Sequence, residues 1–316
     1  MVNWKTLLHP ESDLVCSAPL ASLSHFGSGG PAECLVRPHS LDAVIHVART
    51  CLLQDIPLYV LGQMSNVLVS DKGIPGVTML LTQDVADVQV SGVTVRAEAG
   101  IWLSRLSALA AAHGLSGLEF ACGIPGTLGG SILINAGAYN GQFSEIVTAT
   151  TYLNERGDVC VARGDEHEFG YRTSRFESGG ELILWCEMRL VQSESGDIYR
   201  NMAELAKKRR DSQPLADKSC GSAFKRPPGH FAGKLISDSG LKGYTGRHAG
   251  VSPKHAGFIV NYGKAASQDI ADVFIHVQQE VARQTGVLLE PEVRFAGEFD
   301  RQPQRIHKLR PLFGRE

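Results

Sequence analysis

Two glycine-containing segments of the chain have the composition of loops that bind an anion. The first reads Leu61-Gly62-Gln63-Met64-Ser65-Asn66 and lies between two short apolar runs. The second reads Gly123-Ile124-Pro125-Gly126-Thr127-Leu128-Gly129-Gly130-Ser131. In such loops successive backbone N–H groups can turn toward one point and hold a phosphate. The pair therefore favours a pyrophosphate site, although either loop taken alone is more often a tight turn.

Two other glycine motifs resemble known nucleotide-binding sequences but do not match them. Gly229–Leu235 is one residue too short for a phosphate loop, and Leu235 stands where a Ser or Thr must bind magnesium. Gly27–Ala32 nearly fits the dinucleotide fingerprint, but no predicted strand precedes it and the next predicted helix starts near residue 41. No G-x-S-x-G sequence supports serine hydrolysis.

The cysteines and the charge balance exclude further classes of protein, among them disulfide-stabilised and nucleic-acid-binding proteins. The 7 cysteines are scattered without a C-x-x-C pair, which indicates free thiols rather than disulfides or structural zinc, and we expect no metal. The 31 basic and 33 acidic residues give a net charge of −2, so no nucleic-acid footprint is expected. No apolar run reaches the roughly 18 residues of a membrane span. No secretory signal follows Met1, so the sequence predicts a cytoplasmic protein.

The elements that must position the two loops follow from periodicity. Helical spacing predicts helices over 41–53, 101–113, 198–210 and 267–285, with Ser40 as an N-cap and Gly114 and Gly286 as helix ends. Apolar runs predict strands over 57–61, 67–69, 77–81, 88–90, 93–97, 146–153, 159–162 and 181–190. Residues 287–289 and 292–295 are predicted to form a closing strand, and residues 300–316 a solvated basic tail.

The order of motifs resembles one enzyme family. Gly117–Gly130 and Asn135-Ala136-Gly137-Ala138-Tyr139 resemble the UDP-N-acetylenolpyruvoylglucosamine reductase (MurB) family, type II. The later motifs agree with that family in the same order over residues 20–298: Tyr171–Phe176, Ser212–Pro214, Cys220–Lys225, Ala232–Ile236, Gly240–Gly243, Val251-Ser252, His255-Ala256 and Glu290–Arg294.

The resemblance implies an α+β fold: an FAD-binding domain of the vanillyl-alcohol-oxidase (PCMH) type in two α/β subdomains, and a C-terminal α+β substrate domain. On this basis we divide the chain into an N-terminal arm (1–19), the FAD-binding subdomains (20–81 and 82–213), the substrate domain (214–299) and the tail (300–316). The implied cofactors are non-covalent FAD and NADPH. The implied reaction reduces the enolpyruvyl ether of a UDP-sugar to UDP-N-acetylmuramate.

The resemblance also assigns residues to that chemistry. Hydride addition to the enolpyruvyl double bond leaves negative charge beside its carboxylate, which needs a cation and a proton donor. Arg172 matches the family's catalytic arginine, Glu292 its glutamate, and Ser222 the serine that protonates the carbanion. Taken singly, each of these residues could be an ordinary surface or turn residue.

The remaining assignments concern cofactor and substrate. The cofactor residues are Gly62, Gln63, Met64, Ser65, Asn66, Gly123, Ile124, Pro125, Gly126, Thr127, Gly129, Gly130, Ser131 and Asn135. The substrate residues are Tyr171, Arg210, Lys225 and Arg226.

Four positions depart from the family's usual pattern. Gln63 and Met64 replace glycines of the first loop, which costs on the order of 1 kcal/mol if either residue needs a positive φ. Arg226 and Gly257 each stand where asparagine is common. Two alternatives therefore stay open: a flavin oxidoreductase of the same fold with another substrate, and a non-catalytic relative with weakened FAD binding.

Overall fold

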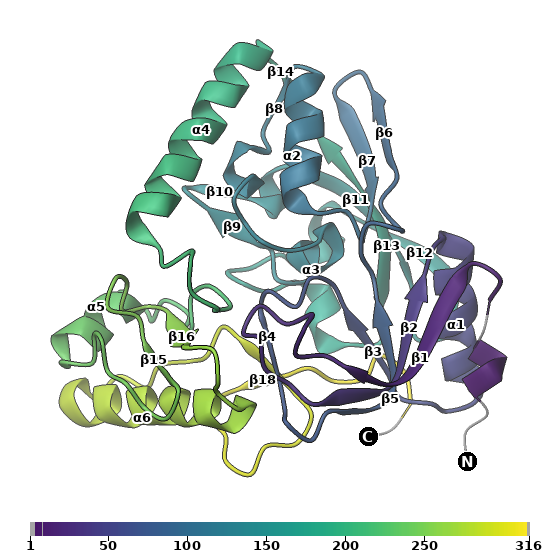
Figure 1. Ribbon diagram of the computed structural model, residues 1–316. Coiled ribbons are helices and arrows are strands. Elements are labelled where there is room, and N and C mark those ends of the chain that lie inside the picture. Colours follow the sequence, from purple (N-terminus) through teal and green to yellow (C-terminus); the bar gives the residue numbers. More distant parts are fainter. Residues whose placement is uncertain (1–3, 8, 315–316) are drawn as a thin grey trace.

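The computed structural model describes residues 4–7 and 9–314, and Figure 1 shows how its elements are arranged. Helices and strands alternate along the chain, in agreement with the predicted α+β class. Residues 1–3, 8, 315 and 316 lie outside the described residues, and with them the two ends of the expected arm and tail.

The first sheet has four strands in the order β1-β2-β5-β3. Its strands are β1 (Ser12–Pro19), β2 (Pro31–Pro38), β3 (Leu58–Leu61) and β5 (Ile74–Leu80). β1 is antiparallel to β2, whereas β5 is parallel to both of its neighbours. Residues 12–19 of the expected N-terminal arm thus form an edge strand of this sheet.

Helix α1 (Leu41–Leu53) has the bounds that the sequence predicts. The Ser40 hydroxyl accepts the Ala43 N–H at 3.2 Å and so caps the helix. The buried face, with Val44 and Val47, packs into one cluster with Val36 and Val77 of the first sheet. This packing fixes the strand β3 that leads directly into the first glycine loop.

The second sheet is antiparallel, with five strands in the order β12-β11-β13-β7-β6. Its strands are β6 (Val88–Ser91), β7 (Thr94–Glu98), β11 (Val147–Leu153), β12 (Val159–Arg163) and β13 (Leu182–Arg189). The helices of this region are α2 (Leu103–Ala112), α3 (Leu128–Leu133) and α4 (Ser195–Ser212). α2 and α3 share a buried cluster with β7 and β13, whereas α4 buries only Ile198. Gly92, in the turn between β6 and β7, and Gly114, the predicted helix end, both have positive φ, of 58° and 65°.

Short elements fill the turns between these strands. β8 (Leu115–Ser116) pairs with β14 (Val191–Gln192), and β9 (Gly137–Ala138) pairs with β10 (Gly141–Gln142). In the described part of the chain, five short 3₁₀ helices cover Trp4–Leu7, Glu119–Ala121, Phe143–Glu145, Gly164–His167 and Arg175–Ser178.

The C-terminal region is a separate small layer, drawn in green and yellow in Figure 1. It contains α5 (Ala232–Asp238), β15 (Ala249–Val251), β16 (Ile259–Asn261) and α6 (Ser267–Thr285). The predicted bounds of α6 are confirmed, and Gly286 ends the helix with a φ of 72°. Within the described part of the chain, no helix has both the length and the apolar character needed to span a membrane.

A third sheet joins the C-terminal part of the chain to the first glycine loop. It consists of the parallel strands β4 (Val67–Val69), β17 (Arg294–Ala296) and β18 (His307–Lys308). The predicted closing strand is wrong over 287–289, and over 292–295 it begins only at Arg294. Pro291 has no N–H to donate to a continued ladder, and the neighbouring groups bond elsewhere: the Glu290 carbonyl accepts from the Lys225 N–H, and the Glu292 N–H donates to the Ala223 carbonyl.

The predicted solvated tail is wrong for the described residues up to Gly314. β18 pairs with β17, and the Phe313 carbonyl accepts the Leu58 N–H at 3.0 Å. The Phe313 side chain is 4% exposed and packs in the cluster of α1 and the first sheet. The basic residues of the tail suggested a solvated chain, but its apolar residues Ile306, Leu309 and Leu312 are half-buried and Phe313 is buried.

We expect Phe313→Ala to lower the free energy of unfolding by about 3 kcal/mol, because it empties a buried site. Urea or guanidinium unfolding followed by fluorescence measures this. Leu53→Ala is the control, since Leu53 is 86% exposed and its loss should change stability by less than about 0.5 kcal/mol. Equal denaturant midpoints of unfolding for the two variants would mean that the Phe313 side chain is not packed against the first sheet.

Candidate active site

The two glycine loops meet in space. The Ser65 hydroxyl donates to the Pro125 carbonyl at 2.7 Å, which ties the first loop to the second. A Cβ atom at Gly62 would lie 2.3 Å from the Thr127 Oγ1, so this close approach requires glycine. Sequence reasoning expected both loops at one anion, and the structure brings them into direct contact.

Met64 carries the backbone strain that its departure from glycine suggested. Its φ is 52°, in the left-handed region, whereas Gln63 is not among the residues with positive φ. The Met64 side chain is 2% exposed and packs with Leu61 and Val67. Burial of a side chain of this size stabilises by roughly 1.5–3 kcal/mol, enough to offset the strain.

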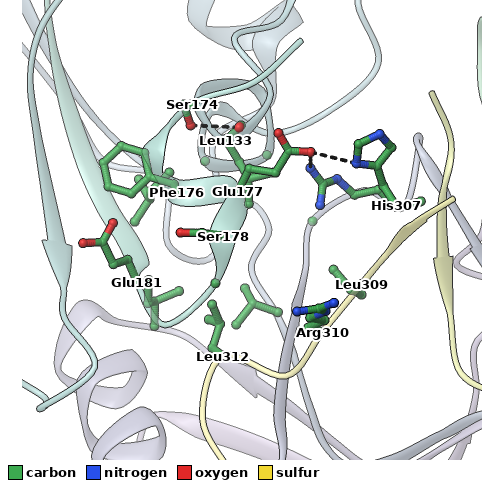
Figure 2. Close-up of a pocket in the computed structure, with 18 of the residues that line it drawn as sticks. Leu133, Ser174, Phe176, Glu177, Ser178, Glu181, His307, Leu309, Arg310 and Leu312 are labelled. Carbon is green, nitrogen blue, oxygen red and sulfur yellow. Dashed lines mark hydrogen bonds and ion pairs between the residues drawn. The ribbon is translucent and has the colours of Figure 1, made fainter. Parts of the chain in front are cut away.

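A cleft of about 540 Å³ runs beside the joined loops. Four of the predicted cofactor residues line it: Gly62, Thr127, Gly129 and Gly130. An added Cβ at Gly129 would lie 2.9 Å from the Ala99 Cβ, so this position also requires glycine. Backbone N–H groups of such loops can hold a phosphate, so the lining fits a bound dinucleotide. Figure 2 shows other lining residues, from Ser174 and Glu177 to Leu309 and Leu312 of the tail.

The other predicted cofactor residues lie outside this lining, and some of them hold the loops in place through hydrogen bonds. Asn66 donates from its amide to the Glu292 carbonyl at 3.2 Å, and the Ser131 hydroxyl donates to the Thr127 carbonyl at 2.8 Å. Gly123 lies against Arg209, whose Nε would be 3.1 Å from an added Cβ. Gln63, Met64, Ser65, Ile124, Pro125 and Gly126 are likewise absent from the lining.

Asn135 positions the turn that carries Arg172. It is buried with a φ of 42°, and its amide donates to the Gly170 carbonyl at 3.0 Å. Gly170 and Thr173 bridge each other across a tight turn, and Arg172 within that turn has a φ of 57°. A left-handed arginine is costly, and strain of this kind concentrates at functional sites.

A second cavity, of about 500 Å³, is lined by Arg172, Ser222 and Glu292 together. The Arg172 Nε lies 2.9 Å from the Glu292 Oε1, and the Arg172 Nη2 donates to the Gly137 carbonyl at 2.9 Å. Ser222 lies in the segment that Glu292 holds through its backbone bond to Ala223. Three groups separated by 50 to 120 positions in the sequence therefore face one space.

The Glu292 carboxyl is protonated more readily than an exposed glutamate. Burial raises the pKa of Glu292, and the adjacent Arg172 guanidinium offsets part of that rise. The carboxyl can therefore take or release a proton nearer to neutrality than an exposed glutamate does.

The rest of this second cavity is basic and contains an exposed aromatic ring. Lys234, Lys242 and Lys254 line it, with Arg226 stacked over the Phe231 ring at 4.4 Å from its centre. Of the predicted substrate residues, Tyr171 and Arg226 are in the lining, and the Tyr171 hydroxyl accepts the Arg226 N–H at 3.3 Å.

Arg210 and Lys225 are not in this lining. The Lys225 Nζ lies 2.9 Å from the Glu290 Oε1, and the Arg210 carbonyl accepts from the Lys254 Nζ at 2.6 Å. Sequence reasoning missed Lys234, Lys242 and Lys254, although each lies within or beside a quoted motif. Their position within or beside those motifs could have identified them as candidate substrate residues.

Two chain segments, residues 172–173 and 292–294, form the wall between the cleft and the second cavity. Arg172 and Glu292 line the second cavity, whereas their near neighbours Thr173 and Arg294 line the cleft. Glu177 ties this wall together, because it accepts from the Thr173 hydroxyl and from the Arg294 Nη2, the latter at 2.7 Å. Burial raises the pKa of Glu177, but the bonds from His307 and Thr173 and the charge of Arg294 lower it to about 2.

His307 of the tail connects this wall to the C-terminal layer. Its Nδ1 lies 3.1 Å from the Glu177 Oε1, a contact drawn in Figure 2, and its Nε2 lies 2.7 Å from the Glu290 Oε1. The bond to Glu177 raises the pKa of His307 most, burial opposes that rise, and Glu290 adds to it. Among the described residues, no group of three or more His, Cys, Asp or Glu could hold a metal ion.

The raised pKa of His307 predicts a pH-dependent stability. The charged imidazolium stabilises the folded state fully below the ordinary histidine pKa of about 6.5, and this contribution is lost as the pH rises through the higher folded value. The ionised Glu177 carboxylate also stabilises the folded state, but this contribution to stability is lost only as the pH falls through about 2. It therefore does not affect the comparison between pH 6 and pH 9. The melting temperature of His307→Gln should therefore fall furthest below that of the parent near pH 6 and approach it by about pH 9. A difference in melting temperature between the two proteins that stays constant from pH 6 to pH 9 would contradict this prediction.

Comparisons with known proteins come from both sequence and structure. Residues 213–296 match the family described as "UDP-N-acetylenolpyruvoylglucosamine reductase, C-terminal domain", and residues 32–163 match "FAD binding domain". The UDP-N-acetylenolpyruvoylglucosamine reductase of Pediococcus pentosaceus is 43% identical over 289 residues, covering 92% of this chain and 96% of the relative. The corresponding reductase of Clostridium botulinum is 41% identical over 299 residues, covering 94% and 98%.

The comparison of structures agrees. The crystal structure of UDP-N-acetylenolpyruvylglucosamine reductase (MurB) from Thermus caldophilus has a TM-score of 0.76 and 33% identity, over 90% of this chain and 98% of that chain. The predicted fold class, an FAD-binding domain followed by a C-terminal α+β domain, is confirmed by these matches.

Proposed function

We propose that this chain, which belongs to the UDP-N-acetylenolpyruvoylglucosamine reductase family, reduces the enolpyruvyl ether of UDP-N-acetylglucosamine enolpyruvate to UDP-N-acetylmuramate. The reaction belongs to the synthesis of peptidoglycan precursors, with FAD as the bound cofactor and NADPH as the reductant. A cytoplasmic location is part of the proposal and is supported by seven cysteines that are all free thiols.

One observation carries the proposal: a guanidinium, a hydroxyl and a carboxyl line a single cavity beside the dinucleotide cleft. Arg172 and Glu292 are joined at 2.9 Å, and Ser222 opens into the same space. These are the types of group that the reduction of a conjugated enol ether requires.

Arg172 stabilises the charge that develops on the substrate. The substrate's carboxylate is conjugated with the double bond, so hydride adds to the terminal carbon and the adjacent carbon gains enolate character. FAD, when bound, supplies the hydride that it has received from NADPH. The planar fork of Arg172 suits the two carboxylate oxygens, and Glu292 keeps that fork oriented.

Ser222 delivers the proton that completes the reaction. A hydroxyl is a weak acid, so it serves only when the carbon beside it is far more basic. Gly221 has a φ of 74° with open space where a Cβ would stand, and this lets the loop approach the substrate. Once the hydroxyl has given its proton, the charge of Arg172 would stabilise the Ser222 alkoxide, and the Glu292 carboxyl, whose pKa is raised, would return a proton to the Ser222 oxygen.

The cofactor and the substrate would be held by different parts of the chain. The amide groups of Gly62, Thr127 and Gly130 would receive the FAD diphosphate, whereas the Gly129 N–H donates to the Ala99 carbonyl at 2.9 Å and holds the second loop in place. Lys234, Lys242, Lys254 and Arg226 would receive the diphosphate of the UDP-sugar, with Phe231 as an apolar contact. The adjoining wall of Arg172 and Glu292 would bring the reacting groups of both together.

The purified protein is expected to be yellow, with flavin absorbance that NADPH bleaches and the enolpyruvyl substrate restores. Spectra recorded before and after each addition test this, with UDP-N-acetylglucosamine as the unreactive control. Restoration by a different acceptor but not by the enolpyruvyl ether would indicate a flavin oxidoreductase with another substrate. Colourless protein that does not take up added FAD would indicate a non-catalytic relative.

The Ser222→Ala variant should separate the two halves of the reaction. Loss of the proton donor should slow substrate reduction by roughly 10²–10⁴-fold and leave flavin reduction by NADPH unchanged. Stopped-flow absorbance measures each half-reaction separately. Ser219→Ala is the matched control, because Ser219 lies in the same loop but is absent from the cavity lining. Equal losses in both half-reactions would contradict the assigned role of Ser222.

A further inference from the structure

The C-terminal segment of the chain forms part of the cleft that we assign to FAD. Residues Ile306, His307, Lys308, Leu309, Arg310 and Leu312 all line it. This segment lies beyond residue 296, where the match to the family's C-terminal domain ends. The known properties of that matched domain therefore do not account for it.

Backbone hydrogen bonds fix the segment at both ends of its path. At its start, the Leu309 N–H donates to the Phe295 carbonyl of β17 at 2.8 Å. At its end, the Leu312 N–H donates to the Leu58 carbonyl of β3 at 2.7 Å. The segment thus crosses from the strand next to Glu292 to the strand that leads into Gly62.

Side-chain packing holds the middle of the segment against the first glycine loop. Leu309 packs on the buried cluster that contains Leu61 and Met64. Successive side chains of an extended chain point to opposite sides, so Lys308 and Arg310 flank Leu309 on the other side of the backbone. Both are exposed, and Figure 2 shows Arg310 in the cleft between Leu309 and Leu312.

The charges of the cleft are mostly paired. Arg175 is held by Glu181 and Arg294 by Glu177, each at 2.7 Å, and His307 contacts both Glu177 and Glu290. Glu168 is a further carboxylate in the lining. Among the cations that line the cleft in the described part of the chain, Lys308 and Arg310 are the ones for which no carboxylate partner is found.

We propose that Arg310 binds the diphosphate of FAD, so that the C-terminal segment completes the dinucleotide site. The glycine loops supply neutral N–H donors, which do not balance the charge of a diphosphate by themselves. Arg310 supplies the missing positive charge, and its planar fork matches phosphate oxygens. This inference rests on the proposed function, because it takes FAD as the occupant of the cleft.

The test compares FAD binding by full-length protein freed of flavin, in the parent, Arg310→Ala, Arg310→Lys and Arg305→Ala forms. Quenching of flavin fluorescence gives the Kd for FAD and, in parallel, for riboflavin, which has the ring but no phosphate. Arg305→Ala is the matched control, since Arg305 is exposed in the same segment and does not line the cleft.

We expect Arg310→Ala to weaken FAD binding roughly 10-fold or more, with riboflavin binding unchanged. Arg310→Lys should recover part of the loss, and added salt should weaken the parent more than Arg310→Ala. Arg305→Ala should match the parent.

Three results would overturn the proposal. The first is equal FAD affinity in Arg310→Ala and the parent, with normal turnover in both; the proposed function would then stand without it. The second is an effect confined to the KM for NADPH, which would assign Arg310 to the other dinucleotide. The third is a parent protein that binds no FAD at all, which would end the proposed function as well.

Discussion

A short extended segment, residues 290–294, holds the site together, and most of its contacts are backbone hydrogen bonds. On one side, the Glu290 carbonyl and the Glu292 N–H bond the loop that carries Ser222. On the other side, the Glu292 carbonyl accepts from Asn66, and the Arg294 N–H donates to the Asn66 carbonyl. The Glu292 carboxylate then reaches Arg172. Three distant regions of the chain are thus fixed around a few residues, and a shift of this segment would move all of them.

The cost of this arrangement appears as local backbone strain. Arg172, Met64 and Asn135 all have left-handed φ values, of 57°, 52° and 42°, without being glycine. Arg172 lines the second cavity, whereas Met64 and Asn135 lie in the segments that support the site. Each of the three is held by a specific contact: Glu292 for Arg172, a buried cluster for Met64, and the Gly170 carbonyl for Asn135. Strain on the order of 1–3 kcal/mol persists only where the surroundings fix the residue, and here those surroundings are the site itself.

The elements with strong local signals were predictable. α1 and α6 have the predicted bounds because apolar spacing, a serine cap and a terminal glycine all act within a few residues of sequence. The failures depend on contacts at long range. The basic composition of the tail is visible in its own sequence and predicts a solvated chain. The pocket that buries Phe313 is built from residues far away in the sequence, such as Leu58. The closing strand reads as continuous, but Pro291 diverts it to the Ser222 loop.

The sequence by itself determined the family, the chemical types at the site and the two glycine loops, since motif order and residue type are properties of the chain. It also indicated that a non-glycine residue in the first loop would be strained. The tertiary structure decided which residues meet: that Arg172 pairs with Glu292, that Lys225 pairs with Glu290 outside the cavity, and that the tail lines the cleft. The physical reason is that hydrogen bonds and ion pairs act over a few ångströms, and only the folded chain sets those distances.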